Sequence, residues 1–321
     1  MAASGAGRGR LRSCHRRRLQ RRSRGDDRPA GGGAGRSAAA RGGPSASSAV
    51  IGGATGRPYH RWVIPFPEPV AGEPLTVSAT LYRTYLQCPQ QALGRLHGEY
   101  PPESRASFRG SLAHRLFARH LTTGPIPADE VEQVCRQEIG SALNAKLVSV
   151  GIVKPSQLKP LISEVGDLYD RFRRFPSDGF RSAEVALESE PVPGVTLKGT
   201  VDAVFDDPAC GTRLVDWKTG ADLEDAPLQL RFYALAWAVE REEIPGRAEA
   251  VSVKTGERLA IEPTLAEAID TAGEVVAMVD TLRTAFRSGE ELERLGGPHC
   301  RWCPLLATCP EGSAAAAIVG M

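Results

Sequence analysis

The residues best suited to chemistry are Asp216 and Lys218, which stand two apart in the string LVDWKTG. On a β-strand, side chains two residues apart point to the same face, while Trp217 between them points to the other. An acid and a base would therefore share one site. Asp202 lies on the preceding strand candidate, and a hairpin through the segment DDPACGT would bring it beside Asp216.

Two carboxylates at one place repel each other unless positive charge lies between them. Hard divalent cations such as Mg²⁺ and Mn²⁺ choose oxygen ligands of this kind, so the pair predicts a metal site. Lys218 would then orient or activate an attacking water and stabilise charge that builds up on a phosphate. An isolated D-x-K is far more often an ordinary strand end. Nearby acids could add a ligand, although the sequence does not fix which face each occupies: Glu184, Glu188 and Glu190.

Two further pairs of residues favour the metal site over an ordinary strand end. Gln229 and Tyr233 are four apart, on one face of a predicted helix that follows the strand carrying Lys218. Gly110 and His114 are one turn apart on a predicted upstream helix.

These residues form four motifs in order: G-x-x-x-H at 110–114, G-x-x-D at 199–202, D-x-K-T-G at 216–220 and Q-L-x-x-Y at 229–233. Together they resemble the RecB-type branch of the PD-(D/E)xK nucleases, from about Thr80 to Cys309. The resemblance implies a restriction-endonuclease-like α/β fold and a Mg²⁺- or Mn²⁺-dependent deoxyribonuclease. The metal ligands it implies are His114, Asp202, Asp216 and the backbone carbonyl of Trp217. Lys218 would be the catalytic lysine, and Gln229 and Tyr233 would help to position the scissile strand.

Three cysteines near the C-terminus, Cys300, Cys303 and Cys309, have the spacing C-x2-C-x5-C. This spacing lets three thiolates converge on one centre from a compact loop. A fourth ligand is needed, and either zinc or an iron–sulfur cluster accepts four thiolates. His299 is a local alternative ligand for zinc, so the spacing alone leaves the two metals open.

RecB-like relatives that hold clusters, including the AddB-type and CRISPR-adaptation nucleases, have one cysteine before the nuclease motifs and three after them. Cys88 and the C-terminal trio share that layout. The resemblance therefore implies a 4Fe-4S cluster on Cys88, Cys300, Cys303 and Cys309, which would join the two ends of the nuclease domain and stabilise it without redox chemistry. The other cysteines are expected to be a free tail thiol and ordinary packing or turn residues: Cys14, Cys135 and Cys210.

The elements that must position these residues follow from hydrophobic periodicity. Helices are predicted after a Ser78 cap, over 106–121, twice within 128–174, over 227–242 and over about 264–287. Strands are predicted at 183–191, 195–205, 212–220, 249–255 and 258–263. This order predicts one α/β domain at 75–312, with a central mixed sheet flanked by helices and an N-terminal helical portion. Residues 313–321 are expected to be a flexible end.

The net charge of +2 hides an uneven distribution. Residues 1–57 carry thirteen arginines and two aspartates, or +11, and the remainder carries 27 basic and 36 acidic residues, or −9. With almost nothing apolar to bury, residues 1–57 are expected to be a disordered basic tail. This tail is a candidate for phosphate contacts, an unselected extension or a transit peptide. No apolar run is long enough to span a bilayer, so we expect a soluble cytoplasmic protein.

Other motifs fit less well. The strings SQLK, SDG and KTG imitate the triplet of penicillin-recognising enzymes, but Pro160 disrupts the required helix and the middle motif lacks its Asn. HGE at 97–99 with a distant C-x-x-C imitates a zinc deaminase, but the proline before the first cysteine is displaced. The serious alternative is a non-catalytic DNA-binding or helicase-partner module of the same fold. The resemblance implies a metal-dependent DNA nuclease that acts on single strands from an end, in DNA repair or recombination. A separate helicase is a possible partner, because no Walker motif is present.

Overall fold

The structure, a computed structural model, describes residues 64–319. The predicted basic tail at 1–57 lies outside these residues. The six strands of the described chain are β1 (Leu75–Ser78), β2 (Phe180–Val192), β3 (Val195–Asp207), β4 (Gly211–Lys218), β5 (Arg247–Ser252) and β6 (Arg258–Ile261). The α-helices are α1 (Ala79–Gln87), α2 (Pro89–Leu96), α3 (Arg105–Thr123), α4 (Val131–Glu138), α5 (Leu158–Phe172), α6 (Ala226–Arg241), α7 (Leu265–Ser288) and α8 (Pro310–Val319).

The strands form one mixed sheet in the order β1-β3-β4-β5-β6, and β2 pairs with β3. β1 runs parallel to β3 and β4 runs parallel to β5, while the pairs β2–β3, β3–β4 and β5–β6 are antiparallel. Within β3–β4, Ala203 lies opposite Val215, and within β2–β3, Ala183 lies opposite Ala203. These two registers set the geometry of the site described below.

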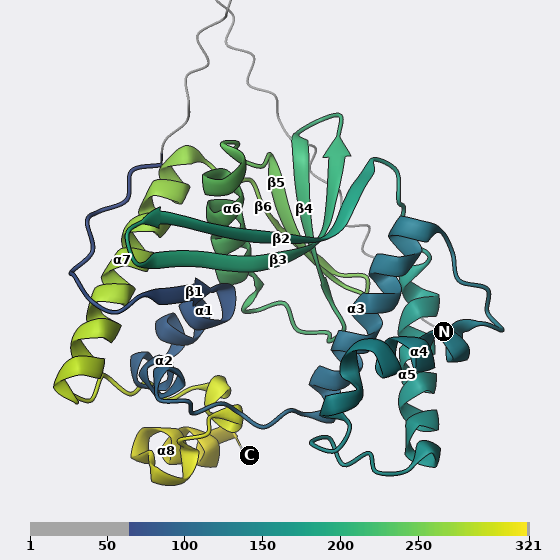
Figure 1. Ribbon diagram of the computed structural model, residues 1–321, viewed down its shortest axis with the longest axis horizontal. Coiled ribbons are helices and arrows are strands. Elements are labelled where there is room, and N and C mark those ends of the chain that lie inside the picture. The colour runs from purple at the N-terminus through teal and green to yellow at the C-terminus, as the bar shows by residue number, and fades with distance from the viewer. Residues whose placement is uncertain (1–63, 320–321) are drawn as a thin grey trace, which may run out of the picture. The chain divides into compact units, whose positions relative to one another are not determined.

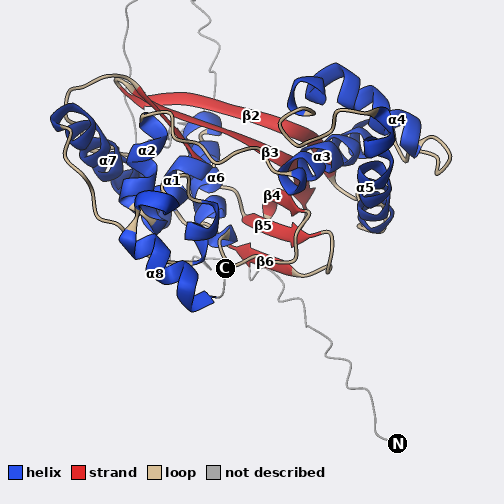
Figure 2. Cartoon of the chain, turned by 90° about the horizontal axis from the view of Figure 1, so that it is seen from below, coloured by secondary structure: helices blue, strands red, loops and turns tan. Residues whose placement is uncertain are grey.

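The helices form two groups, which Figure 1 and Figure 2 show at different parts of the sheet. α1, α2, α6 and α7 pack with one hydrophobic cluster, and α3, α4 and α5 pack with a second. Alternate residues of β4 are divided between them: Leu214 belongs to the first cluster, and Val215 and Trp217 belong to the second. The face of β4 that carries Asp216 and Lys218 is therefore the face covered by α6.

The prediction of a mixed α/β fold with a central sheet flanked by helices is confirmed. The predicted cap of the first helix is also present, because Ser78 Oγ accepts a hydrogen bond from the Leu81 N–H at 3.1 Å. The short edge strand β1 and the separate helix α2 were not predicted. Where a flexible end was expected at 313–321, residues 313–319 belong to α8, and 320–321 lie outside the described chain.

Within residues 64–319, no helix is both long enough and apolar enough to cross a membrane.

Cys135 on α4 offers a test of the packing of the second cluster. It is fully buried, and burial, followed by the charges of Glu132 and Glu138, raises the pKa of its thiol to about 11. Because the thiolate is the reactive form, we expect Cys135 to resist iodoacetamide at pH 8 in the folded protein and to react after unfolding in urea. Peptide mass spectrometry measures this, with the half-buried Cys210 as internal comparison. Equal labelling of the two cysteines in the folded protein would contradict the packing.

Candidate metal centre and active site

Three carboxylates lie in a row across β2, β3 and β4. Because Ala203 pairs with Val215, Asp202 lies opposite Asp216. Because Ala183 and Val185 pair with Ala203 and Val201, Glu184 lies opposite Asp202. Residues directly opposite on antiparallel strands have Cβ atoms about 5 Å apart and share a face of the sheet. The sheet register therefore brings Glu184, Asp202 and Asp216 to one place.

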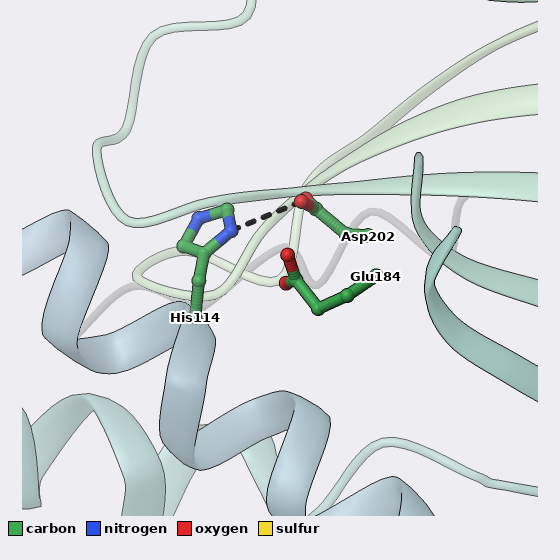
Figure 3. Close-up of side chains that lie close together, drawn as sticks. All are labelled: His114, Glu184 and Asp202. Atoms are coloured by element: carbon green, nitrogen blue, oxygen red, sulfur yellow. Dashed lines mark hydrogen bonds and ion pairs between the residues drawn. The ribbon is translucent and has the colours of Figure 1, made fainter. Parts of the chain in front are cut away.

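The helix α3 adds an imidazole to this row. His114 Nδ1 lies 3.1 Å from Asp202 Oδ1. One ligand atom each of His114, Glu184 and Asp202 lies within 4.8 Å of the other two. Figure 3 shows the three side chains pointing toward one another, one from the helix and two from strands. Two carboxylates and an imidazole at this separation fit a divalent cation.

Glu184 adopts an unusual backbone conformation. Its φ is 49°, in the left-handed region that non-glycine residues avoid at a cost of about 1–2 kcal/mol. Strain of this kind persists only where surrounding structure enforces it, and it gathers at functional sites. Here it accompanies the placement of a carboxylate beside His114 and Asp202.

The second carboxylate oxygen of Asp202 is bound by the backbone of β4. The Trp217 N–H donates a hydrogen bond to Asp202 Oδ2 at 2.7 Å. The indole ring points the other way and packs edge-on against Phe172, with ring centroids 5.0 Å apart. Trp217 thus couples the orientation of Asp202 to the packing of the second hydrophobic cluster.

Asp216 and Lys218 meet two residues of α6 in a continuous polar chain. Lys218 Nζ lies 2.8 Å from Asp216 Oδ2 and donates to Gln229 Oε1 at 2.6 Å. The Gln229 amide in turn donates to Asp216 Oδ1 at 3.0 Å and to the Tyr233 hydroxyl at 2.8 Å. Gln229 therefore fixes the relative positions of the carboxylate and the ammonium group.

Two glycines of the motifs permit close contacts around this chain. A Cβ at Gly199 would lie 3.2 Å from the Tyr233 ring, and a Cβ at Gly110 would lie 3.3 Å from Thr219 Oγ1. Glycine at these positions lets α6 approach β3, and lets α3 approach the end of β4.

The charges at the site shift the titration of its groups. Burial, followed by the charge of Asp202, raises the pKa of Asp216 to about 6 against the opposing effect of Lys218. Burial and Asp202 also raise the pKa of Glu184. Burial opposes protonation of His114, but the Asp202 carboxylate outweighs it and raises the pKa to about 9. Each raised pKa keeps a proton on its group to a higher pH and so reduces the negative charge of the site. This is expected of a site that accommodates a cation.

The four predicted cluster ligands also lie near one another, since the charges of Cys88, Cys300 and Cys309 all act on Cys303. Cys88 separates α1 from α2, while Cys300 lies in the short helix Pro298–Trp302. Cys88, Cys303 and Cys309 line one cavity of about 180 Å³, and Cys300 is buried. Burial opposes ionisation of Cys88, but hydrogen bonds with His299 and with the backbone of Leu295 and Gln91 together outweigh it and lower the pKa of this thiol.

Residues 76–310 match the family model of the PD-(D/E)XK nuclease superfamily. The chain belongs to this superfamily. The PD-(D/E)XK nucleases use divalent metal ions, which agrees with the group His114, Glu184 and Asp202.

Solved structures add more distant likenesses. A protein from Eubacterium rectale described as a candidate exonuclease is 16% identical, with 68% of this chain and 83% of that protein covered and a TM-score of 0.43. The protein SSO0001 is 17% identical, with 63% and 95% covered and a TM-score of 0.30. No curated protein sequence matches the chain. Membership of the PD-(D/E)XK superfamily rests on the family match.

The structure divides the predicted site residues of this nuclease domain into two adjoining groups. His114 and Asp202 belong to the group whose ligand atoms are close enough to share one cation. The polar chain beside this group consists of Asp216, Lys218, Gln229 and Tyr233. Glu184 was left open by the sequence and joins the first group. The other two acids of β2 do not: Glu188 pairs with Lys198 at 2.8 Å, and Glu190 accepts a hydrogen bond from the Gly194 N–H.

Replacement of Glu184 tests its place in the metal centre. We expect Glu184→Gln to weaken Mn²⁺ binding by at least about tenfold, because even residues that only support metal ligands contribute that much. Isothermal titration with Mn²⁺ measures the effect. Glu188→Gln, four residues along the same strand and turned toward Lys198, is the matched control. If both variants bind Mn²⁺ as the wild type does, Glu184 is not a ligand.

Proposed function

We propose that this chain is a metal-dependent deoxyribonuclease that hydrolyses phosphodiester bonds of single-stranded DNA from an end. The observation that carries the proposal is the row Glu184–Asp202–Asp216 with Lys218 at its side, in a chain that belongs to a nuclease superfamily. A purely structural role does not account for three carboxylates at adjacent positions of three strands, because like charges in register destabilise a sheet.

The donor set fits a small divalent cation such as Mg²⁺ or Mn²⁺. The atoms of His114, Glu184 and Asp202 are close enough to share one ion, and oxygen donors predominate. The residues that would hold the metal are His114, Glu184, Asp202, Asp216 and the backbone carbonyl of Trp217. When bound, the cation would polarise the phosphodiester and lower the pKa of water. His114 would give up its proton to bind, because only the neutral imidazole is a ligand.

Lys218 supplies the positive charge that the protein itself brings to the reaction. Its ammonium group is held between Asp216 Oδ2 and Gln229 Oε1, so its position is fixed before substrate arrives. Fixed charges that need no reorganisation stabilise developing negative charge most effectively. The Gln229 amide and the Tyr233 hydroxyl lie next to it and are available to position the scissile strand.

The catalytic roles predict a simple activity pattern. We expect Lys218→Ala and Asp216→Asn to lower the rate of DNA cleavage by at least about 100-fold, since loss of one preorganised electrostatic contact costs that much. Gel assays with labelled linear single-stranded DNA and Mg²⁺ or Mn²⁺ measure the rate, with the surface variant Lys198→Ala as control. Chelation with EDTA should abolish cleavage, and circular single-stranded DNA should resist an enzyme that needs an end. Equal rates in all variants would show that the site is misassigned.

We propose further that Cys88, Cys300, Cys303 and Cys309 hold a 4Fe-4S cluster. The cavity of about 180 Å³ that Cys88, Cys303 and Cys309 line supports a centre larger than a single ion. Arg294 also lines the cavity, where it pairs with Glu291 at 2.7 Å.

Metal analysis distinguishes the two centres. We expect protein purified without oxygen to be brown and to contain about four iron atoms per chain. Cys303→Ser should lose this iron, whereas Cys210→Ser, outside the cavity, should retain it. A colourless wild-type protein that contains zinc would contradict the cluster.

We place this activity in DNA repair or recombination, where an exonuclease acts on ends that another enzyme opens. The sequence has no Walker motif of the form G-x-x-x-x-G-K-[ST], which supports a separate helicase as partner.

A further inference from the structure

A basic groove begins next to Lys218 and leads away from the carboxylates. It consists of two hollows of about 160 and 300 Å³ that share Arg171 and Lys254. The first hollow is also lined by Arg109 and Thr219. The second is also lined by Arg174, which follows α5, and by residues of the β5–β6 turn. We refer to these hollows together as the basic groove.

The basic groove is anchored to the polar chain of the active site. Thr219 directly follows Lys218 in the sequence, and the Val253 N–H donates to the Lys218 carbonyl at 2.8 Å. Arg171 Nη1 donates to the Lys254 carbonyl at 2.6 Å, which joins the end of α5 to the same turn. The positions of the groove and of Lys218 are therefore set by the same contacts.

The charge of the groove is not neutralised by its acids. Arg174 and Lys254 are exposed, and neither side chain makes an ion pair with any residue of the described chain. The Glu164 carboxylate beside them is already engaged by Arg105 at 2.9 Å and Arg109 at 3.0 Å. Only Asp167 among the lining residues offers a further negative charge.

This positive surface stands out because residues 58–321 carry a net charge of −9. Phosphate groups of a DNA strand are attracted to lysine and arginine regardless of sequence, and hydroxyl groups such as that of Thr219 also bind phosphate oxygens. A strand whose scissile phosphate lies at the carboxylates would need such contacts beyond Lys218 to offset the repulsion by those carboxylates.

We propose that the basic groove binds the phosphate backbone of the single DNA strand next to the scissile bond, with Arg174 and Lys254 each neutralising one phosphate. This inference rests on the proposed nuclease function and adds the path of the substrate. Arg171 contributes its charge and also holds the Lys254 turn in place.

Salt-dependent binding tests the groove separately from cleavage. The probe is a fluorescein-labelled 30-nucleotide oligo(dT) in Ca²⁺, shown intact on a gel, and anisotropy measures the observed binding constant from about 50 to 200 mM salt. For the double variant Arg174→Ala/Lys254→Ala, the slope of log Kobs against log [salt] should become shallower by about 1.4, because each lost phosphate contact on a single strand removes about 0.7. The charge-matched control Lys159→Ala/Lys198→Ala should keep the wild-type slope. Arg174→Lys/Lys254→Arg should keep it as well, since it preserves both charges.

The outcomes separate the groove from the proposed function. A wild-type slope in Arg174→Ala/Lys254→Ala overturns the groove, while loss of cleavage in Lys218→Ala would still support the nuclease. An equal fall in slope in the control double variant also overturns it, because the effect would then reflect net charge alone. If the wild type neither binds nor cleaves DNA, both proposals fail.

Discussion

The constraint on which the site depends is the alignment of Glu184, Asp202 and Asp216 across three hydrogen-bonded strands. Carboxylates at opposite positions repel one another, and burial of Asp216 adds a cost of desolvation. The molecule offsets this with His114 from α3, Lys218 from β4 and the Gln229 amide from α6. Each neighbouring element thus brings a charge or a hydrogen bond to the same three oxygen-bearing groups, and a bound cation would complete the compensation.

The same strands carry the packing that keeps these groups in place. β4 is buried on both faces, with Leu214 in one hydrophobic cluster and Val215 and Trp217 in the other. Trp217 packs against Phe172 of α5 and donates its backbone N–H to Asp202, so the second hydrophobic cluster supports the position of Asp202. The helix α3 of the same cluster also supplies His114. A catalytic group supported in this way loses little entropy when substrate binds.

The sequence was sufficient to predict the mixed α/β fold, the hairpin that joins Asp202 to Asp216, and the shared face of Asp216 and Lys218, because period-two alternation and a short turn determine them. Glu184 could not be placed by the same reasoning. Counting back from the pair Val192–Val195 at the turn would put Asp202 opposite Val185. A register shift between Ser189 and Val192 moves the pairing by one residue and brings Glu184 opposite Asp202 instead. β1 was missed because four residues carry too little periodicity to identify an edge strand.

The charge distribution explains how a domain of net charge −9 could handle a polyanion. Electrostatic interactions between exposed groups fade over about 8–10 Å at moderate salt, so a phosphate responds to the groups near it and little to the domain total. The carboxylates alone would repel the phosphate. Binding of the substrate, as well as its cleavage, would therefore depend on the cation. Beside the carboxylates, Lys218 and the turn that carries Lys254, joined by the hydrogen bond from the Val253 N–H to the Lys218 carbonyl, bring positive charge. Placement of charge along the path of the strand therefore matters more than its sum.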